Sequence, residues 1–284
     1  MRRFEFYSPR SLGEALRFLS EKGERAKVIA GGTDLIPRLR EGVSRPDFVL
    51  NVLEVGELSG IREADEALHI GAITTHTQIA ESSFLQRICP ALTQAAASIG
   101  GPPVRNRGTI GGNIVNASPA ADLACALLAL DAEAVLRSEK GSRAVALEDF
   151  FTGPGQTVIR PDELLTEVTV RAPKGKGLFR KLGRRQAMSL SIVNVAVFME
   201  MEGKVCRKCR VALGSVAPTP IRCPQAEEMI VNKETTPELI LKCAAEAIKA
   251  TQPIDDQRAK AWYRIEAGTV LLRRALAEAT GLRA

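Results

Sequence analysis

The chain has 284 residues, of which 45% are hydrophobic, 4% aromatic and 25% charged, and its formal net charge is +6 at neutral pH. Its longest apolar stretches are far shorter than the roughly 20 residues that cross a bilayer, which excludes a membrane-spanning protein. The small basic excess selects no partner by itself, and the scarcity of aromatic residues argues against a nucleic-acid-binding module.

The N-terminal segment and the cysteines point to the same compartment. The segment Met1-Arg2-Arg3-Phe4-Glu5 runs into a polar stretch and lacks the apolar run of a signal peptide. Six cysteines at irregular spacing fit reduced thiols better than a disulfide framework. We therefore expect a cytoplasmic protein without disulfides.

Residues 1–55 predict a compact α/β unit. Ser11-Leu-Gly-Glu14 has the pattern of a helix-capping box, and the apolar residues after it recur at helical spacing as far as Gly23. A strand at 27–30, a turn at Gly31-Gly32, a helix at 34–40 and a strand at 48–51 follow.

Residues 56–172 predict a second unit. Its expected strands cover 68–72, 134–137 and 165–170, and its expected helices cover 77–82, 90–99 and 122–130. A second glycine pair, Gly111-Gly112, interrupts this unit before the last of these helices.

A loop rich in Pro, Gly and Lys at 171–177 marks a boundary, and residues 175–282 predict a third unit. Strands at 192–200 and 204–213 are separated by a short turn, as in an antiparallel hairpin. Helices are expected at 237–250 and 259–279, with Gly281 as the stop signal.

The two glycine turns carry the most specific chemical signal. Glycine has no Cβ, so the backbone at Gly31-Gly32 and Gly111-Gly112 can approach a phosphate and direct N–H groups towards it. Thr33 and Thr109 add hydroxyl donors beside these amides. One such turn is usually only a tight turn, but two predict a phosphate-bearing ligand between two α/β units.

Other candidate groups are weaker. His69 is interpreted as structural, whereas His76 follows a strand end and is a candidate to approach a ligand. Cys206 and Cys209 form a C-x-x-C pair, but residues three apart on a strand should point to opposite faces, which disfavours metal chelation. A diphosphate would repel the Asp122 carboxylate, so a ligand contact there would be with sugar or ribityl hydroxyls. Asp122 is alternatively a helix N-cap, and both roles can hold.

At these residues the sequence resembles the FAD-binding medium subunits of the molybdenum hydroxylases, a family that includes xanthine, carbon monoxide and nicotinate dehydrogenases. The resemblance covers nearly the whole chain in order. Its motifs are Phe4-Glu-Phe-Tyr-Ser-Pro9, Ala30-Gly-Gly-Thr-Asp-Leu35, Ile70-Gly-Ala-Ile-Thr-Thr-His76, Val104-Arg-Asn-Arg-Gly-Thr-Ile-Gly-Gly-Asn113, Ala117-Ser-Pro-Ala-Ala-Asp122, Pro161-Asp-Glu-Leu-Leu165 and Val211-Ala-Leu-Gly-Ser-Val-Ala-Pro-Thr-Pro-Ile-Arg222.

The resemblance implies an α+β chain. Residues 1–172 would form a PCMH-type FAD-binding domain of two α/β subdomains, at about 1–55 and 56–172. Residues 175–282 would form the smaller α+β C-terminal domain of molybdenum hydroxylase flavoproteins, with an antiparallel sheet and helices.

The resemblance also assigns site residues, and it assigns neither a catalytic residue nor a metal ligand to this chain. The two turns would hold the FAD diphosphate from both sides, Asp122 would bind hydroxyls, Ile99 and Leu164 would give apolar contacts, and Lys181 or Arg180 would lie near the flavin. The full set is Val28, Ile29, Ala30, Gly31, Gly32, Thr33, Asp34, Leu35, Ile99, Thr109, Ile110, Gly111, Gly112, Asn113, Asp122, Leu164, Arg180 and Lys181.

The implied function is electron transfer. FAD on this chain would accept electrons from [2Fe-2S] clusters on a small subunit, fed by molybdopterin on a large subunit, and pass them to an acceptor such as NAD. A heterotrimer or a dimer of heterotrimers is expected. Phe151-Thr-Gly-Pro-Gly155 and Pro220-Ile-Arg-Cys223 resemble xanthine or nicotinate dehydrogenase subunits more than the carbon monoxide enzyme, and we favour the xanthine dehydrogenase type. The alternatives are a carbon monoxide or nicotinate dehydrogenase subunit and a stand-alone PCMH-type flavin oxidase.

Overall fold

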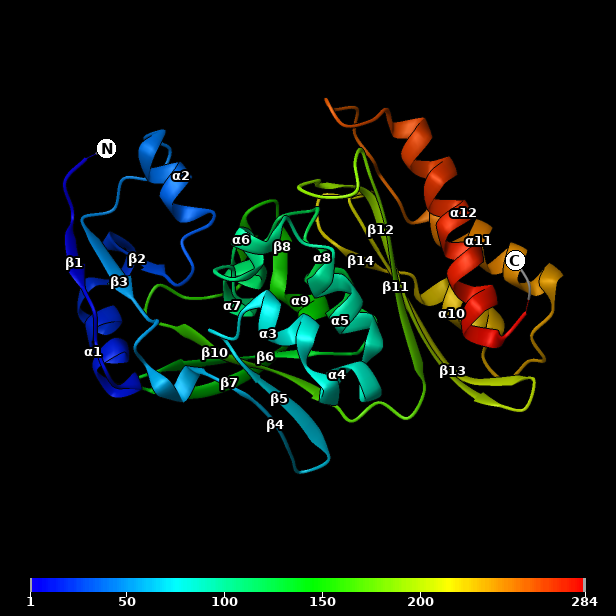
Figure 1. The fold of residues 1–284 in the computed structure, drawn as a ribbon, viewed down its shortest axis with the longest axis horizontal. Coiled ribbons are helices and arrows are strands. Elements are labelled where there is room, and N and C mark those ends of the chain that lie inside the picture. Colours follow the sequence, from blue (N-terminus) through cyan, green and yellow to red (C-terminus); the bar gives the residue numbers. More distant parts are fainter. Residues whose placement is uncertain (1, 283–284) are drawn as a thin grey trace.

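The computed structural model describes residues 2–282, which form three units, each with its own sheet (Figure 1). The N-terminal unit, the middle unit and the C-terminal unit follow one another along the long axis of the molecule, in the blue, cyan-to-green and yellow-to-red parts of the ribbon. No helix within residues 2–282 is long and apolar enough to cross a membrane.

The N-terminal unit has a parallel sheet in the order β1-β3-β2. Its elements are β1 (Glu5–Tyr7), α1 (Leu12–Lys22), the short 3-10 helix η1 (Gly23–Arg25), β2 (Ala26–Ile29), α2 (Leu35–Arg40), β3 (Phe48–Asn51) and η2 (Gly56–Leu58). Ala15, Leu16 and Leu19 on one face of α1 are buried against Leu50 of the sheet. The expected Ser11 cap is present, since Ser11 Oγ accepts from the Glu14 N–H at 3.3 Å. The Glu14 carboxylate, however, accepts from the Arg10 N–H and not from that of Ser11.

The middle unit has an antiparallel sheet in the order β4-β5-β10-β6-β7. Its strands are β4 (Ile61–Ala64), β5 (Ala67–Gly71), β6 (Glu133–Ser138), β7 (Gly141–Ala146) and β10 (Leu164–Arg171), with a small ribbon of β8 (Phe151–Gly153) and β9 (Gln156–Thr157). Its helices are α3 (His76–Glu81), α4 (Ser83–Ile88), α5 (Pro90–Ala97), α6 (Pro102–Arg105), α7 (Ile110–Val115), α8 (Asp122–Leu128) and α9 (Leu147–Phe150).

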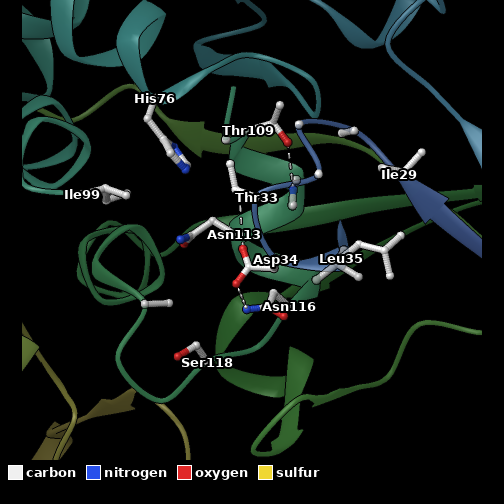
Figure 2. Close-up of a pocket in the computed structure, with 18 of the residues that line it drawn as sticks. Ile29, Thr33, Asp34, Leu35, His76, Ile99, Thr109, Asn113, Asn116 and Ser118 are labelled. Carbon is white, nitrogen blue, oxygen red and sulfur yellow. Dashed lines mark hydrogen bonds between the residues drawn. The ribbon is translucent and has the colours of Figure 1, made fainter. Parts of the chain in front are cut away.

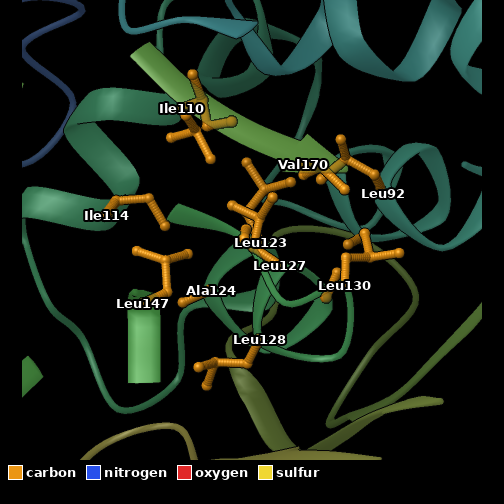
Figure 3. Packing of buried hydrophobic residues seen from close by; sticks show 14 of the residues in the cluster. Leu92, Ile110, Ile114, Leu123, Ala124, Leu127, Leu128, Leu130, Leu147 and Val170 are labelled. Carbon is orange, nitrogen blue, oxygen red and sulfur yellow. The ribbon is translucent and has the colours of Figure 1, made fainter. Parts of the chain in front are cut away.

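Helix α8 is buried along its whole length and organises the core of the middle unit. Leu123 and Leu127 pack among Ile110, Ile114 and Leu147 (Figure 3). A helix with apolar residues on all sides is stable only inside a core. Helix α8 meets this condition because it lies between the middle and C-terminal units and contacts both.

The C-terminal unit has an antiparallel sheet in the order β11-β12-β13-β14, with α10, α11 and α12 on its outer side (Figure 1). These elements are β11 (Lys176–Gly183), β12 (Ser191–Glu202), β13 (Val205–Gly214), β14 (Ile221–Arg222), α10 (Pro224–Ile230), α11 (Pro237–Lys249) and α12 (Ala261–Thr280). Helices α5 and α8 of the middle unit contact the strands of this sheet. Gly281 ends α12 in the left-handed region, at φ +75°, as the sequence predicts.

One prediction about the cysteines is wrong. A register shift in the β12–β13 pairing puts an extra residue between Cys206 and Lys208, so Cys206 and Cys209 both face the core instead of opposite sides. All six cysteines are free and buried. Within residues 2–282 no group of His, Cys, Asp or Glu side chains is arranged to hold a metal ion.

Candidate functional site

A cavity of about 580 Å³ lies between the N-terminal and middle units and extends towards the C-terminal unit. Both glycine turns line it, and side chains from the two turns face each other across it (Figure 2). The cavity thus lies where the sequence predicted a ligand between two units.

The first turn connects β2 to α2 and packs directly on the second. A Cβ on Gly31 would lie 1.7 Å from the Arg107 carbonyl oxygen, so only glycine permits this approach of the two loops. Gly32 has φ +73°, which is also a glycine conformation. Within residues 2–282, no hydrogen bond uses the N–H groups of Gly31, Gly32 or Thr33. This turn therefore offers free backbone donors, as expected.

The second turn differs from the expectation. Thr109 caps α7 by accepting from the Gly112 N–H at 3.1 Å, and the Gly111 N–H donates to the Ala72 carbonyl at 2.9 Å. A Cβ on Gly111 would lie 2.7 Å from that same Ala72 oxygen. The prediction that Gly111 and Gly112 direct free N–H groups to a phosphate is therefore wrong, because these donors are used within the protein. Gly111 serves close packing, and Gly112 is exposed at the cavity.

Polar side chains connect and extend the turns. Asn116, just after α7, donates from Nδ2 to Asp34 Oδ1 at 3.2 Å and so joins the two turns (Figure 2). Asn113 also lines the cavity, and its buried Oδ1 has no hydrogen-bond partner within residues 2–282. A buried polar atom without a partner is costly and therefore indicates a place for a ligand or a water molecule.

Asp122 lies at the inner end of the cavity and is 5% exposed. It is not the N-cap of α8, because that position is Ala121 and the Asp122 side chain caps no backbone N–H. The N-cap interpretation is therefore wrong. Instead its carboxylate accepts from Lys181 Nζ at 2.6 Å, Ser191 Oγ at 2.6 Å and Asn194 Nδ2 at 2.7 Å, all from the C-terminal unit.

Arg180 and Lys181, the two basic candidates, are neighbours on β11 and point to opposite faces of this strand. Lys181 lines the cavity, and its ammonium also donates to the Ser98 carbonyl at 3.0 Å. Arg180, the preceding residue, does not line the cavity and instead contacts Glu278 and Gln94. Successive side chains of a strand point to opposite faces, so only Lys181 can face a ligand there.

The structure brings nearly all of the predicted site residues to this cavity. Besides Arg180, the exception is Ile110, which is fully buried in the core of the middle unit. The residues that line the cavity are Val28, Ile29, Ala30, Gly31, Gly32, Thr33, Asp34, Leu35, Ile99, Thr109, Gly111, Gly112, Asn113, Asp122, Leu164 and Lys181. His76, the candidate histidine, also lines it.

The site residues assigned from the sequence do not include the loop that connects β11 to β12. Met188, Ser189 and Leu190 line the cavity from the C-terminal unit, and the Met188 N–H donates to the Gly100 carbonyl at 3.0 Å. Met188 has a positive φ of 52°, unusual for a residue with a side chain. A single sequence contains no signal for the contact between Met188 and Gly100, because the two residues lie far apart along the chain.

The comparisons with known proteins cover the whole architecture. Residues 2–173 match the family described as the FAD binding domain in molybdopterin dehydrogenase, and residues 178–279 match the CO dehydrogenase flavoprotein C-terminal domain. The carbon monoxide dehydrogenase medium chain of Hydrogenophaga pseudoflava is 34% identical, over 96% of each chain. The xanthine dehydrogenase FAD-binding subunit of Escherichia coli O157:H7 is 33% identical, over 96% of this chain and 95% of the relative.

A solved structure agrees with these matches. The carbon monoxide dehydrogenase from Hydrogenophaga pseudoflava that lacks the Mo-pyranopterin moiety of the molybdenum cofactor aligns with a TM-score of 0.95, over 100% of this chain and 99% of that chain, at 34% identity. The resemblance in the sequence is confirmed, and so is the α+β fold. The chain belongs to the family of FAD-binding medium subunits of the molybdenum hydroxylases.

Proposed function

We propose that this chain holds FAD in the cavity between its N-terminal and middle units and serves as an electron-transfer subunit of a molybdenum hydroxylase complex. The observation that carries the proposal is the first glycine turn. Its free N–H groups face a cavity whose opposite wall is the second turn. Backbone donors at the start of a helix suit a diphosphate.

The described residues fit FAD in three further respects. Asn113 supplies a buried carbonyl oxygen that lacks a donor, as expected of a residue awaiting a hydroxyl or amide. Ile99 and Leu164 provide apolar wall for the flat rings of the cofactor. Lys181 places a positive charge at the inner end, where it would favour a reduced, anionic flavin.

Bound FAD would supply one-electron and two-electron redox chemistry, so this chain needs no general base. Its residues bind the diphosphate, orient the ring and exclude water. Asp122 is already bonded to three donors from the C-terminal unit, so we propose that it positions Lys181 as well as meeting a cofactor hydroxyl. In domain terms, we propose an FAD-binding domain over 1–172, with subdomains at about 1–55 and 56–172, and a C-terminal domain over 175–282.

The relatives support a proposal for the partners, and two sequence motifs support a proposal for the substrate. We propose a [2Fe-2S] small subunit and a molybdopterin-binding large subunit as partners in a heterotrimer or a dimer of heterotrimers, with an acceptor such as NAD. The xanthine dehydrogenase type stays our first proposal, on the sequence features around Phe151 and Pro220. Overall similarity does not separate the substrates, since the carbon monoxide, xanthine and nicotinate relatives are 34%, 33% and 35% identical to this chain.

The test is the flavin content of the purified chain. The wild-type protein should show a flavin spectrum or take up FAD when it is added. Gly112→Val should lose FAD, because Gly112 lines the cavity and the added side chain would take up space that the cofactor needs. It should keep its fold, because a Cβ at this exposed position meets only the Thr109 hydroxyl, at 3.1 Å. Gly13→Val is the matched control, because Gly13 lies in α1 with nothing within 4 Å of its Cβ position.

Failure of the wild-type chain to bind FAD would overturn the proposal, and so would normal flavin content in Gly112→Val. Co-purification from the native host tests the partners. FAD binding without any molybdenum or iron-sulfur partner would favour the stand-alone oxidase instead.

A further inference from the structure

The imidazole of His76 lines the cavity and forms no hydrogen bond with any of residues 2–282. His76 is the first residue of α3 and is 3% exposed. Its Nδ1 is buried and lacks a hydrogen-bond partner within residues 2–282. Figure 2 shows its ring extending from α3 into the cavity, on the side of Thr33 and Asn113. Such a ring indicates a ligand contact that the glycine turns do not account for.

The backbone holds the ring in one place. Thr75 and Gln78 form a reciprocal capping box around the start of α3, and the His76 N–H donates to the Gly108 carbonyl at 3.0 Å. A Cβ on Gly108 would lie 2.9 Å from both Cδ2 and Nε2 of the ring. The backbone at His76 is therefore held in place, and the imidazole lies on a glycine next to Thr109.

The environment also fixes the form of the ring. Burial, and the charge of Arg105, lower the pKa of His76 to about 4, so the ring is neutral at pH 7. A neutral imidazole carries one N–H and one lone pair. A proton on the buried Nδ1 would have no acceptor, so we place it on Nε2 from the hydrogen-bond environment.

We propose that His76 is a further cofactor-binding residue, whose Nε2–H donates a neutral hydrogen bond to an oxygen of the FAD diphosphate. The inference rests on the proposed function. The diphosphate is the expected acceptor because the ring lies against Gly108, and the Gly31 turn packs on the same Arg107-Gly108 segment. The donor adds affinity without fixing a second charge in the site.

The chain offers an internal control. It has two histidines, and the other, His69, lies in β5 away from the residues that line the cavity. His69 Nδ1 is 3.3 Å from Glu167 Oε1. Labelling histidine with 13C at Cε1 thus gives two NMR signals, one from each environment, in the full-length chain.

The experiment adds FAD, ADP or riboflavin to the FAD-free, labelled protein. FAD and ADP should shift the His76 signal and leave the His69 signal in place, and riboflavin, which has no diphosphate, should shift neither. An unchanged His76 signal with bound FAD would overturn the inference. A His76 shift with riboflavin but not with ADP would overturn it too, by moving the contact to the flavin. If the wild-type chain binds no FAD, it is the proposed function that fails.

Variants give a second measurement. A hydrogen bond to a charged acceptor corresponds to roughly 10- to 100-fold in affinity, so His76→Leu should weaken FAD binding by that factor. His76→Gln keeps an N–H at similar reach and should lose less. His69→Gln should bind FAD as the wild type does. Equal affinities for wild type, His76→Leu and His76→Gln would contradict the assignment.

Discussion

Where the N-terminal unit meets the middle unit, the structure has a cavity lined by the N–H groups of the first turn, the Asn113 oxygen and the His76 ring, none of which has a hydrogen-bond partner in the described part of the chain. Where the C-terminal unit meets the middle unit, the buried Asp122 carboxylate is bonded to Lys181, Ser191 and Asn194. The first junction has polar groups that await a ligand. At the second junction the Asp122 carboxylate is bonded to side chains of the protein itself, and Asn194 Oδ1 is a buried side-chain oxygen there that has no partner within residues 2–282. The difference separates residues that bind from residues that hold the units together.

The largest expected effect is a loss of stability in Asp122→Ala, at the junction between the middle and C-terminal units. This change leaves the Lys181 ammonium, whose side chain is 12% exposed, without its anionic partner. Breaking a buried ion pair costs about 3–5 kcal/mol, and urea unfolding of the FAD-free chain should show a loss of this size. The control is Glu202→Ala, which breaks an exposed pair with Arg207 and should cost at most about 1 kcal/mol. Similar losses in both variants would mean that Asp122 does not hold the units together.

The next effect is a pH dependence of stability that comes from His76, at the junction between the N-terminal and middle units. The pKa of His76 is lowered from 6.5 to about 4 in the folded chain, so on acidification the unfolded chain takes up a proton first. The stability that the neutral ring contributes is therefore complete above about pH 6.5 and falls, by up to about 3 kcal/mol, as the pH decreases towards 4. Unfolding curves of wild type and His76→Asn should converge or cross with falling pH. Parallel curves would contradict this prediction.

A smaller effect is expected for Gly32→Ala in the first turn. Gly32 has φ +73°, and an added Cβ would lie 3.1 Å from the Ile36 side chain. A left-handed residue with a side chain costs about 1–2 kcal/mol, measurable as a lower thermal midpoint. Gly13→Ala, in a helix with open space around it, should instead stabilise by up to about 1 kcal/mol. A stabilised Gly32→Ala would show that the turn is not strained by a side chain.

The last prediction compares Arg180 and Lys181, the two neighbours on β11, by the reduction potential of bound FAD. Arg180→Met removes a partly exposed pair with Glu278, so it should cost about 1 kcal/mol or less and leave FAD affinity unchanged. Lys181→Met removes a positive charge from the wall of the cavity, so it should lower the reduction potential of bound FAD. It also breaks the buried pair with Asp122 and should therefore destabilise the fold, as Asp122→Ala does. Equal reduction potentials of bound FAD in Lys181→Met and Arg180→Met would contradict the prediction that only Lys181 acts on the flavin.

Much of the fold could be predicted because its signals are local. The Ser11 cap, the β12–β13 hairpin and the Gly281 stop each depend on residues close in sequence. The short helix α7 was not predicted, since it contains two glycines, which disfavour helix. The position of β10 between β5 and β6 depends on pairings between distant residues, for which a single sequence has no signal.

The candidate site divides in the same way. The two turns could be predicted as lining a ligand, because a glycine pair after a strand is a local pattern. The use of the Gly111 N–H by Ala72 could not, since the partner lies on another segment. The partners of Asp122 are 59, 69 and 72 residues away in the sequence, so its role between units was hidden. The bulge near Cys206 was equally invisible, because only the opposite strand reveals it.

The buried thiols make unfolding of each unit separately observable. Cys89 and Cys125 lie in the core of the middle unit, whereas Cys206, Cys209, Cys223 and Cys243 lie in that of the C-terminal unit. A brief pulse of an alkylating reagent modifies a thiol only when its surroundings open. Mass spectrometry of the labelled peptides would therefore report the order in which these two units come apart, without any added probe.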